Sequence, residues 1–151
     1  MQQVNVYVKT SIRGIGKKPG SFIYLLETQT KKGLATIYDI GVLPEEMSEE
    51  AAEIYAIVEA LKRMKPGTEN QIVIYASNHI LKNSFEHHLP VWTRNGFKKR
   101  NGEDIANKNL WFSLASSNSV FHLRIDLSPH SYSKWLESEL EKFEKREKHN
   151  C

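Results

Sequence analysis

Cysteine is almost absent from this sequence: among its 151 residues, only the last one, Cys151, is a cysteine. A single thiol excludes an internal disulfide, which fits a reducing compartment. Long apolar runs are also missing, and none approaches the roughly 20 residues that cross a membrane. The polar start, Met1-Gln2-Gln3, lacks the charged and apolar regions of a signal peptide. The sequence therefore predicts a cytoplasmic protein that does not associate with membranes.

A strong excess of one charge is lacking as well, because the formal net charge is only +3 at pH 7. That value is weak evidence about partners. Apolar residues make up 40% of the chain and charged residues 26%, which is the composition of an ordinary folded protein. A chain of 151 residues can form one sizeable core but is short for two, so we predict a single domain over residues 1–151.

Alternating apolar residues predict three strands near the start of the chain. Valines alternate with other residues over positions 4–8, a period-two pattern that should end near Thr10. A loop with three cations follows, and residues 21–27 and 34–42 then form two further apolar segments. The turn signal Lys31-Lys32-Gly33 lies between them, so the three strands should form an antiparallel meander.

A helix and a buried strand are predicted next. Ser48 can cap the first turn of a helix whose apolar residues recur at helical spacing until Pro66-Gly67. Residues 72–76 form a short apolar run that suits a strand buried on both faces of a sheet. A strand, a helix and a strand in this order form a crossover, which places its strands parallel in one sheet.

The remainder of the chain should contain more helices and one more strand. Residues 77–88 are predicted to be helical, with Pro90 marking a break or a new first turn. A fifth strand is predicted at residues 120–127, and a terminal helix at residues 132–148. The apolar residues that this terminal helix should bury are Trp135, Leu136, Leu140 and Phe143.

The most distinctive segment spans residues 92–111, where flat aromatic rings alternate with positive charge. Its aromatic residues include Trp92 and Trp111, and four clustered cations, Arg94, Lys98, Lys99 and Arg100, lie between them. Such a combination suits a phosphate backbone and its sugars. A simpler interpretation exists for both features, because aromatic rings can anchor a segment by burial and a charge run can be merely solvated. We expect Trp111 to lie mostly in the core.

This segment is similar to the basic protrusion of type 1 ribonuclease H. The shared pattern is an aromatic, three residues, Gly-aromatic-Lys, a polar turn and Asn-x-x-Leu-Trp, which here starts at Trp92 and ends at Trp111. Glu53 and the pair Ser77-Asn78 also match family positions, and the order of the predicted elements is that of the family. The resemblance implies an α/β fold whose five-stranded mixed sheet has three antiparallel strands, then two in parallel crossovers, flanked by helices.

The resemblance also implies a metal site, most of which this chain lacks. In the family, four carboxylates bind two magnesium ions, which activate water and stabilise the leaving oxygen of the RNA strand in an RNA/DNA hybrid. Here Lys9 and Ala76 replace two aspartates, while Glu53 remains. Magnesium needs hard oxygen ligands, and Lys9 would repel a dication by an energy of the order of a few kcal/mol. We therefore expect no metal cofactor, with Mg or Mn needed only if the protein is active, and we expect Lys9 to pair with Glu53.

Further residues of this vestigial site are implied by the resemblance alone. His130 aligns with a histidine in the family's mobile loop. The carboxylate of the family's last helix falls one residue away from both Glu139 and Glu141, so either could replace it only after a one-residue shift. Asp39 and Asp126 lie on predicted strands and stay open as substitute ligands.

Nucleic-acid contacts are implied by the resemblance as well. Ser48 and Asn78 match polar positions that touch the duplex in the family, but Glu49 and Glu50 place negative charge where the family has amides. The basic segment is therefore the better candidate for binding phosphates. The complete set of candidate contact residues is Ser48, Asn78, Trp92, Arg94, Lys98, Lys99, Arg100 and Asn107.

Three functions follow from these observations and stay open at this point. The leading prediction is a protein that binds an RNA/DNA hybrid or another duplex without cleaving it. A second possibility is a metal-dependent nuclease that cleaves the RNA of a hybrid with a variant site around Glu53. A third is a protein-interaction or assembly module, in which the charged terminal helix contacts a protein partner.

Overall fold

Five strands form one mixed sheet in this protein, whose computed structural model describes residues 2–65 and 70–149. The predicted helix stop at Pro66-Gly67 and the lone thiol of Cys151 lie outside these residues. The order across the sheet is β3-β2-β1-β4-β5, with antiparallel pairing of β1, β2 and β3 and parallel pairing of β4 with β1 and β5. This topology confirms the predicted fold class. The strands are β1 (Gln2–Thr10), β2 (Ser21–Thr30), β3 (Gly33–Val42), β4 (Asn70–Tyr75) and β5 (His122–Asp126).

Strand β1 lies at the centre of the sheet and contributes to a core on each face. Val4, Val6 and Val8 pack into the larger core, as the alternating pattern predicts. Tyr7 points to the other face, where it packs in a smaller core with Ile23, Leu25, Leu136 and Leu140. Because side chains alternate along a strand, Lys9 lies on the same face as Tyr7, at the end of β1.

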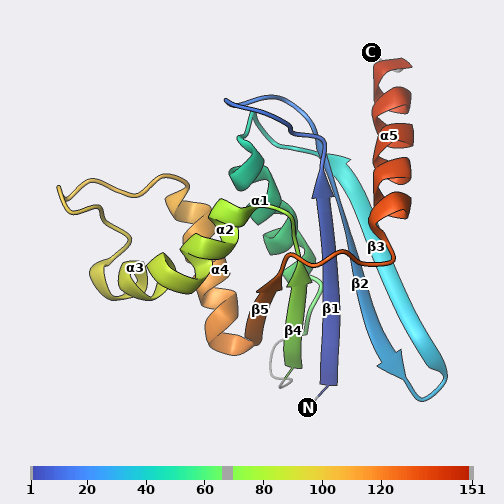
Figure 1. Cartoon of the computed structure of the whole chain (residues 1–151), viewed down its shortest axis with the longest axis horizontal. Coiled ribbons are helices and arrows are strands. Elements are labelled where there is room, and N and C mark those ends of the chain that lie inside the picture. The colour runs from blue at the N-terminus through green and yellow to red at the C-terminus, as the bar shows by residue number, and fades with distance from the viewer. Residues whose placement is uncertain (1, 66–69, 150–151) are drawn as a thin grey trace.

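The helices are distributed unequally between the two faces, as Figure 1 shows. Helix α1 (Glu49–Leu61) covers one face, and the Ser48 hydroxyl accepts a hydrogen bond from the Ala51 N–H at 3.2 Å, which confirms the predicted cap. Helix α5 (Ser133–His149) lies by itself on the other face and packs against β1 and β2. Trp135 and Phe143 are only half-buried because Leu136 and Leu140 form the covered stripe of α5.

The segment between β4 and β5 differs most from the prediction. The single helix predicted over residues 77–88 is a short helix α2 (His79–Asn83) that continues as a π-helical turn (Ser84–His88) and then as α3 (Leu89–Asn95). Pro90 occupies the first turn of α3, which is where a missing backbone N–H costs least. Helix α4 (Lys108–Val120) ends where the fifth strand was predicted to begin, so β5 starts two residues later.

Burial of Trp111 fixes this outer layer of helices to the sheet. Its side chain is among the largest that are fully buried, as predicted, and it belongs to the larger core together with residues of α1. None of the helices in residues 2–65 and 70–149 is long and apolar enough to cross a membrane. The loop between α3 and α4 projects away from the sheet (Figure 1) and carries most of the segment that was predicted to be basic.

Candidate functional site

A cleft opens where the carboxyl ends of β1 and β4 meet the start of α1. The two strands run parallel with Tyr7 opposite Tyr75, so Lys9 and Ala76 both follow at the same edge of the sheet. The cleft has a volume of about 470 Å³. Its charged and polar lining residues, which define what we call the Lys9 cleft, are Lys9, Thr10, Arg13, Glu49, Glu53, Ser77, Asn78 and His79.

Glu53 is held in the wall of this cleft by three hydrogen bonds. Its Oε1 accepts from the backbone N–H groups of Ser77 at 2.8 Å and Asn78 at 3.0 Å. Its Oε2 accepts from the Ser77 hydroxyl at 3.0 Å. The residue is only 6% exposed, and a buried carboxylate is tolerated when such donors replace water. Glu53 therefore ties the loop after β4 to helix α1.

Lys9 does not form the ion pair with Glu53 that we expected. Among the described residues, no carboxylate oxygen lies within ion-pair distance of the Lys9 ammonium. The physical reason is that both Glu53 oxygens already accept hydrogen bonds from the loop after β4. A second cation of the cleft, Arg13, donates instead to the backbone carbonyl oxygens of Thr10 at 2.8 Å and Ile12 at 2.6 Å.

The donor set of the cleft does not suit a divalent cation. Within residues 2–65 and 70–149, no three His, Cys, Asp or Glu side chains gather closely enough to hold a metal ion. Asp126, at the end of β5, accepts from the Ser128 N–H at 2.7 Å and pairs with Arg124 at 3.3 Å. Asp39 lies on β3, which β2 separates from β1. Neither aspartate lines the Lys9 cleft.

The carboxylates of α5 lie on the far side of Lys9, and of the two candidates from the family register, Glu141 lines a pocket beside Lys9 but Glu139 does not. Glu139 pairs with Lys142 at 3.3 Å, along the helix surface. Glu137, Glu141 and Glu144 instead line a neighbouring pocket of about 380 Å³ that Lys9 also borders. Helix geometry explains the difference, because Leu140 takes the inward position of this turn.

His130 packs over the end of β1 among aromatic rings. Its ring centroid lies 4.6 Å from that of Tyr7 and 5.6 Å from that of Tyr75. Its Nδ1 accepts from the Tyr132 backbone N–H at 3.2 Å. Burial, and secondly the positive charge of Lys9, lower the pKa of His130 below its ordinary value. A neutral imidazole therefore covers this part of the sheet at neutral pH.

A partly buried hydrogen-bond cluster that sequence reasoning missed holds the same loop in place. Glu27 on β2 accepts from Tyr7 Oη at 3.1 Å, from Asn5 Nδ2 at 3.0 Å and from Tyr132 Oη at 2.5 Å. Burial alone raises the pKa of Glu27, but these three hydrogen bonds outweigh it and leave the pKa below its ordinary value. The only sequence signal was the alternation along β1, which places Asn5 and Tyr7 on the face of Lys9.

The basic protrusion, residues 92–111, includes the end of α3, the start of α4 and a small hairpin-like loop, residues 96–107, between them. The Lys99 N–H donates to the Glu103 carbonyl oxygen at 2.7 Å, and the Ile105 N–H donates to the Phe97 carbonyl oxygen at 3.1 Å. Phe97 is buried although it adopts a left-handed backbone with φ of 63°. Such strain persists only where the surroundings fix it, and here the buried ring does so.

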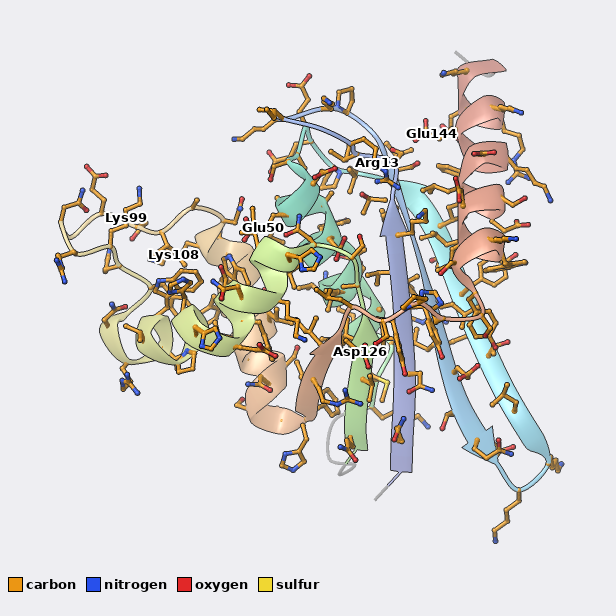
Figure 2. All side chains as sticks on the ribbon, in the orientation of Figure 1. Arg13, Glu50, Lys99, Lys108, Asp126 and Glu144 are labelled. Atoms are coloured by element: carbon orange, nitrogen blue, oxygen red, sulfur yellow. The ribbon has the colours of Figure 1, made fainter. Side chains whose placement is uncertain are left out.

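The four predicted cations of this region are not equivalent in the structure. Lys98 pairs with Asp104 at 2.5 Å, and Asp104 also binds Lys108 at 3.2 Å. These lysines hold the pKa of Asp104 below its ordinary value, Lys98 more than Lys108. Arg94, Lys99 and Arg100 are exposed and have no carboxylate partner within the described residues. Figure 2 shows Lys99 and Lys108 on the protrusion, far from Asp126.

The remaining predicted contacts have local structural partners. Trp92 is half-buried between Trp111, with ring centroids 5.3 Å apart, and His88, at 5.6 Å. The Asn78 side-chain oxygen caps α2 by accepting from the Leu81 N–H at 2.8 Å. Asn107 precedes α4 in a left-handed conformation and makes no side-chain cap. Ser48, like Asn78, is thus a cap residue at the border of the cleft.

Comparisons with known proteins agree with this architecture. A sequence model described as RNase H matches residues 1–125. Ribonuclease H from Syntrophomonas wolfei is 33% identical over 87 residues, which cover 56% of this chain and 59% of that relative. In three of the curated relatives, that protein among them, the aligned part is less than two thirds of their length.

Solved structures show the same fold. The crystal structure of LC9-RNase H1, a type 1 RNase H with the type 2 active-site motif, has a TM-score of 0.70 at 19% identity, covering 91% of this chain and 69% of that one. The foamy viral protease-reverse transcriptase in complex with an RNA/DNA hybrid has a TM-score of 0.60 at 17% identity, covering 85% of this chain and 17% of that one.

Proposed function

The chain belongs to the RNase H family, and from this premise we propose that it binds an RNA/DNA hybrid or a similar duplex without cleaving it. The fold brings a cleft at the strand ends and a basic protrusion onto one molecule. The foamy viral protein of the same fold is described in complex with an RNA/DNA hybrid. That likeness supports nucleic acid as the partner class here.

The observation that carries the proposal is the chemistry of the Lys9 cleft. Hydrolysis assisted by two metal ions needs several carboxylate oxygens that converge on the ions. This cleft has an ammonium at the end of β1 and a glutamate whose oxygens accept three hydrogen bonds, and the residue that follows β4 at the same sheet edge is Ala76, which offers no ligand. A divalent ion would have to displace those donors and approach Lys9. We therefore propose that no metal cofactor is used.

Binding is supported separately by the cations of the protrusion. Arg94, Lys99 and Arg100 are exposed and without ion pairs among the described residues, so their charge is available to phosphate groups. Contacts of this kind fix position without reading sequence. We accordingly propose duplex recognition that depends weakly on base sequence and strongly on salt.

One experiment tests binding and cleavage together. An end-labelled RNA/DNA hybrid is incubated with the protein in magnesium, in manganese and in EDTA, and retention and product length are both scored. We expect retention in all three conditions and intact RNA throughout. RNA cleavage that disappears in Glu53→Gln would establish a nuclease instead. Absence of retention at low salt would remove the binding proposal, and a co-purifying protein would then favour an assembly role.

A further inference from the structure

Lys9 and Arg13 are two cations that line the same cleft. Neither has a carboxylate within ion-pair distance in the part of the chain that the structure describes. Arg13 uses one guanidinium nitrogen for two backbone carbonyl oxygens. A guanidinium carries five N–H donors, so most of its donors stay open, as do the three donors of the Lys9 ammonium.

The carboxylates of the same cleft are directed at backbone groups. Glu53 accepts from Ser77 and Asn78, as described above, and Glu49 Oε1 accepts from the Gly14 N–H at 3.1 Å. These bonds hold both carboxylates in the cleft wall and use both oxygens of Glu53 and Oε1 of Glu49. The cleft thus presents cationic donors that have no carboxylate partner among the described residues, whereas its buried carboxylate, Glu53, already accepts three hydrogen bonds.

We propose that the Lys9 cleft binds a phosphate group of a nucleic-acid backbone directly, with no divalent ion between the phosphate and the protein. This inference rests on the proposed function for the identity of the ligand. Lys9 supplies a compact charge, and Arg13 supplies a planar fork that matches two phosphate oxygens. The amide nitrogen of Asn78 makes no hydrogen bond within the described residues and adds a neutral donor at the wall.

A neighbouring pocket borders Lys9 and Arg13 on the α5 side. It is lined by three carboxylates, Glu137, Glu141 and Glu144, and by two further cations, Lys145 and Lys148. Glu144 also accepts a hydrogen bond from the Ser21 hydroxyl, and Figure 2 shows Arg13 and Glu144 at the same end of the sheet. The Lys9 cleft itself lies on the side of α1 and α2, where Glu53 already accepts three hydrogen bonds.

The test uses inorganic phosphate and a labelled hybrid as probes, both in EDTA. In the first arm, phosphate is titrated into the ¹⁵N-labelled protein, and saturable shifts are expected for the amides of Gly14, Ser77 and Asn78. In the second arm, Lys9→Gln should weaken hybrid binding roughly tenfold, as expected when one charge-assisted hydrogen bond is removed. Lys9→Arg keeps the charge and should retain most of the affinity. The control is Lys17→Gln, the same charge change on an exposed residue outside the cleft, which should cost about threefold or less.

The outcomes separate this inference from the proposed function. Equal losses of affinity in Lys9→Gln and Lys17→Gln, with both variants folded by thermal unfolding, would overturn the cleft inference while hybrid binding stands. Absence of hybrid binding by the wild type would overturn the proposed function, and the phosphate titration would then decide the cleft alone. Shifts of the three amides that persist in Lys9→Gln, or no shifts at all, would count against a phosphate site.

Discussion

Salt dependence of hybrid binding distinguishes the cations of the protrusion from one another. Arg94, Lys99 and Arg100 have no ion pair within the described residues, whereas Lys98 is bound to Asp104 at 2.5 Å. The informative perturbation is therefore the triple replacement of Arg94, Lys99 and Arg100 by glutamine. The matched control is Lys98→Gln, which removes the same kind of charge from the same loop.

The size of the effect follows from how many phosphate groups these three side chains neutralise. Each neutralised phosphate contributes about 0.9 to the slope of log affinity against log salt, so three phosphates contribute about 2.7. Between 50 and 200 mM salt, that slope corresponds to roughly a 40-fold change in affinity. Over this salt range, the fold-change in the affinity of the triple variant should therefore be about 40 times smaller than the fold-change in the affinity of the wild type. Lys98→Gln should change the slope by much less than one phosphate does, because its ammonium already faces Asp104.

Fluorescence anisotropy of a labelled hybrid, measured in EDTA at several salt concentrations, gives both slopes. Thermal unfolding of each variant checks that the loop substitutions leave the fold intact. Equal slopes for the wild type and the triple variant would refute phosphate binding by these residues. A slope change in Lys98→Gln that equals one third of the triple effect would show that the ion pair with Asp104 opens on binding.

Two further predictions concern stability. The pKa of His130 in the folded state lies below its ordinary value of 6.5, so the unfolded chain takes up a proton first as the pH falls, and the free energy of unfolding should drop in acid. Urea unfolding at pH 7.5 and at pH 5 should show a smaller drop for His130→Gln than for the wild type. An identical drop in both proteins would contradict a half-buried, neutral His130 ring. Glu53→Gln leaves one N–H or O–H donor of the β4–α2 loop without its acceptor and should lower the free energy of unfolding, measured in urea, by about 1–3 kcal/mol. The control, Glu59→Gln, removes a surface ion pair with Lys62 and should change the free energy of unfolding by no more than about 0.5 kcal/mol. Equal changes in the two variants would refute the anchoring role of Glu53.

The elements that the sequence predicted well are those whose pattern is local. The alternation in β1 and the cap at Ser48 depend on neighbours in the chain, so both were found in place. Helix α4 was not foreseen because only Trp111 and Leu114 of its residues are buried, and its second half is rich in serine. Two buried residues in thirteen positions give too weak a helical period to recognise.

The candidate site shows the same limit at the level of individual hydrogen bonds. Register with the family identified Lys9, Ala76 and Glu53, but opposite charge alone suggested an ion pair that is not formed. Backbone N–H groups of Ser77 and Asn78 compete better for Glu53, since they are already fixed by the fold and lose little entropy on binding. A lysine would have to immobilise a long side chain to reach the same oxygens. Arg13 was missed because only the folded loop brings it to the cleft.

Loss of the aspartates and the structural role of Glu53 are physically connected. Carboxylates that share a small site repel one another unless a dication lies between them, so a metal-free cluster of four would raise their pKa values and strain the fold. With Lys9 and Ala76 at two of these positions and Leu140 at the position in the last helix, one carboxylate remains in register, and it can be satisfied by the loop after β4 alone. The cations of the protrusion lie on the last turn of α3 and on the loop between α3 and α4, away from this site. Under the proposed function, the metal site can therefore disappear without any cost to phosphate binding by the protrusion.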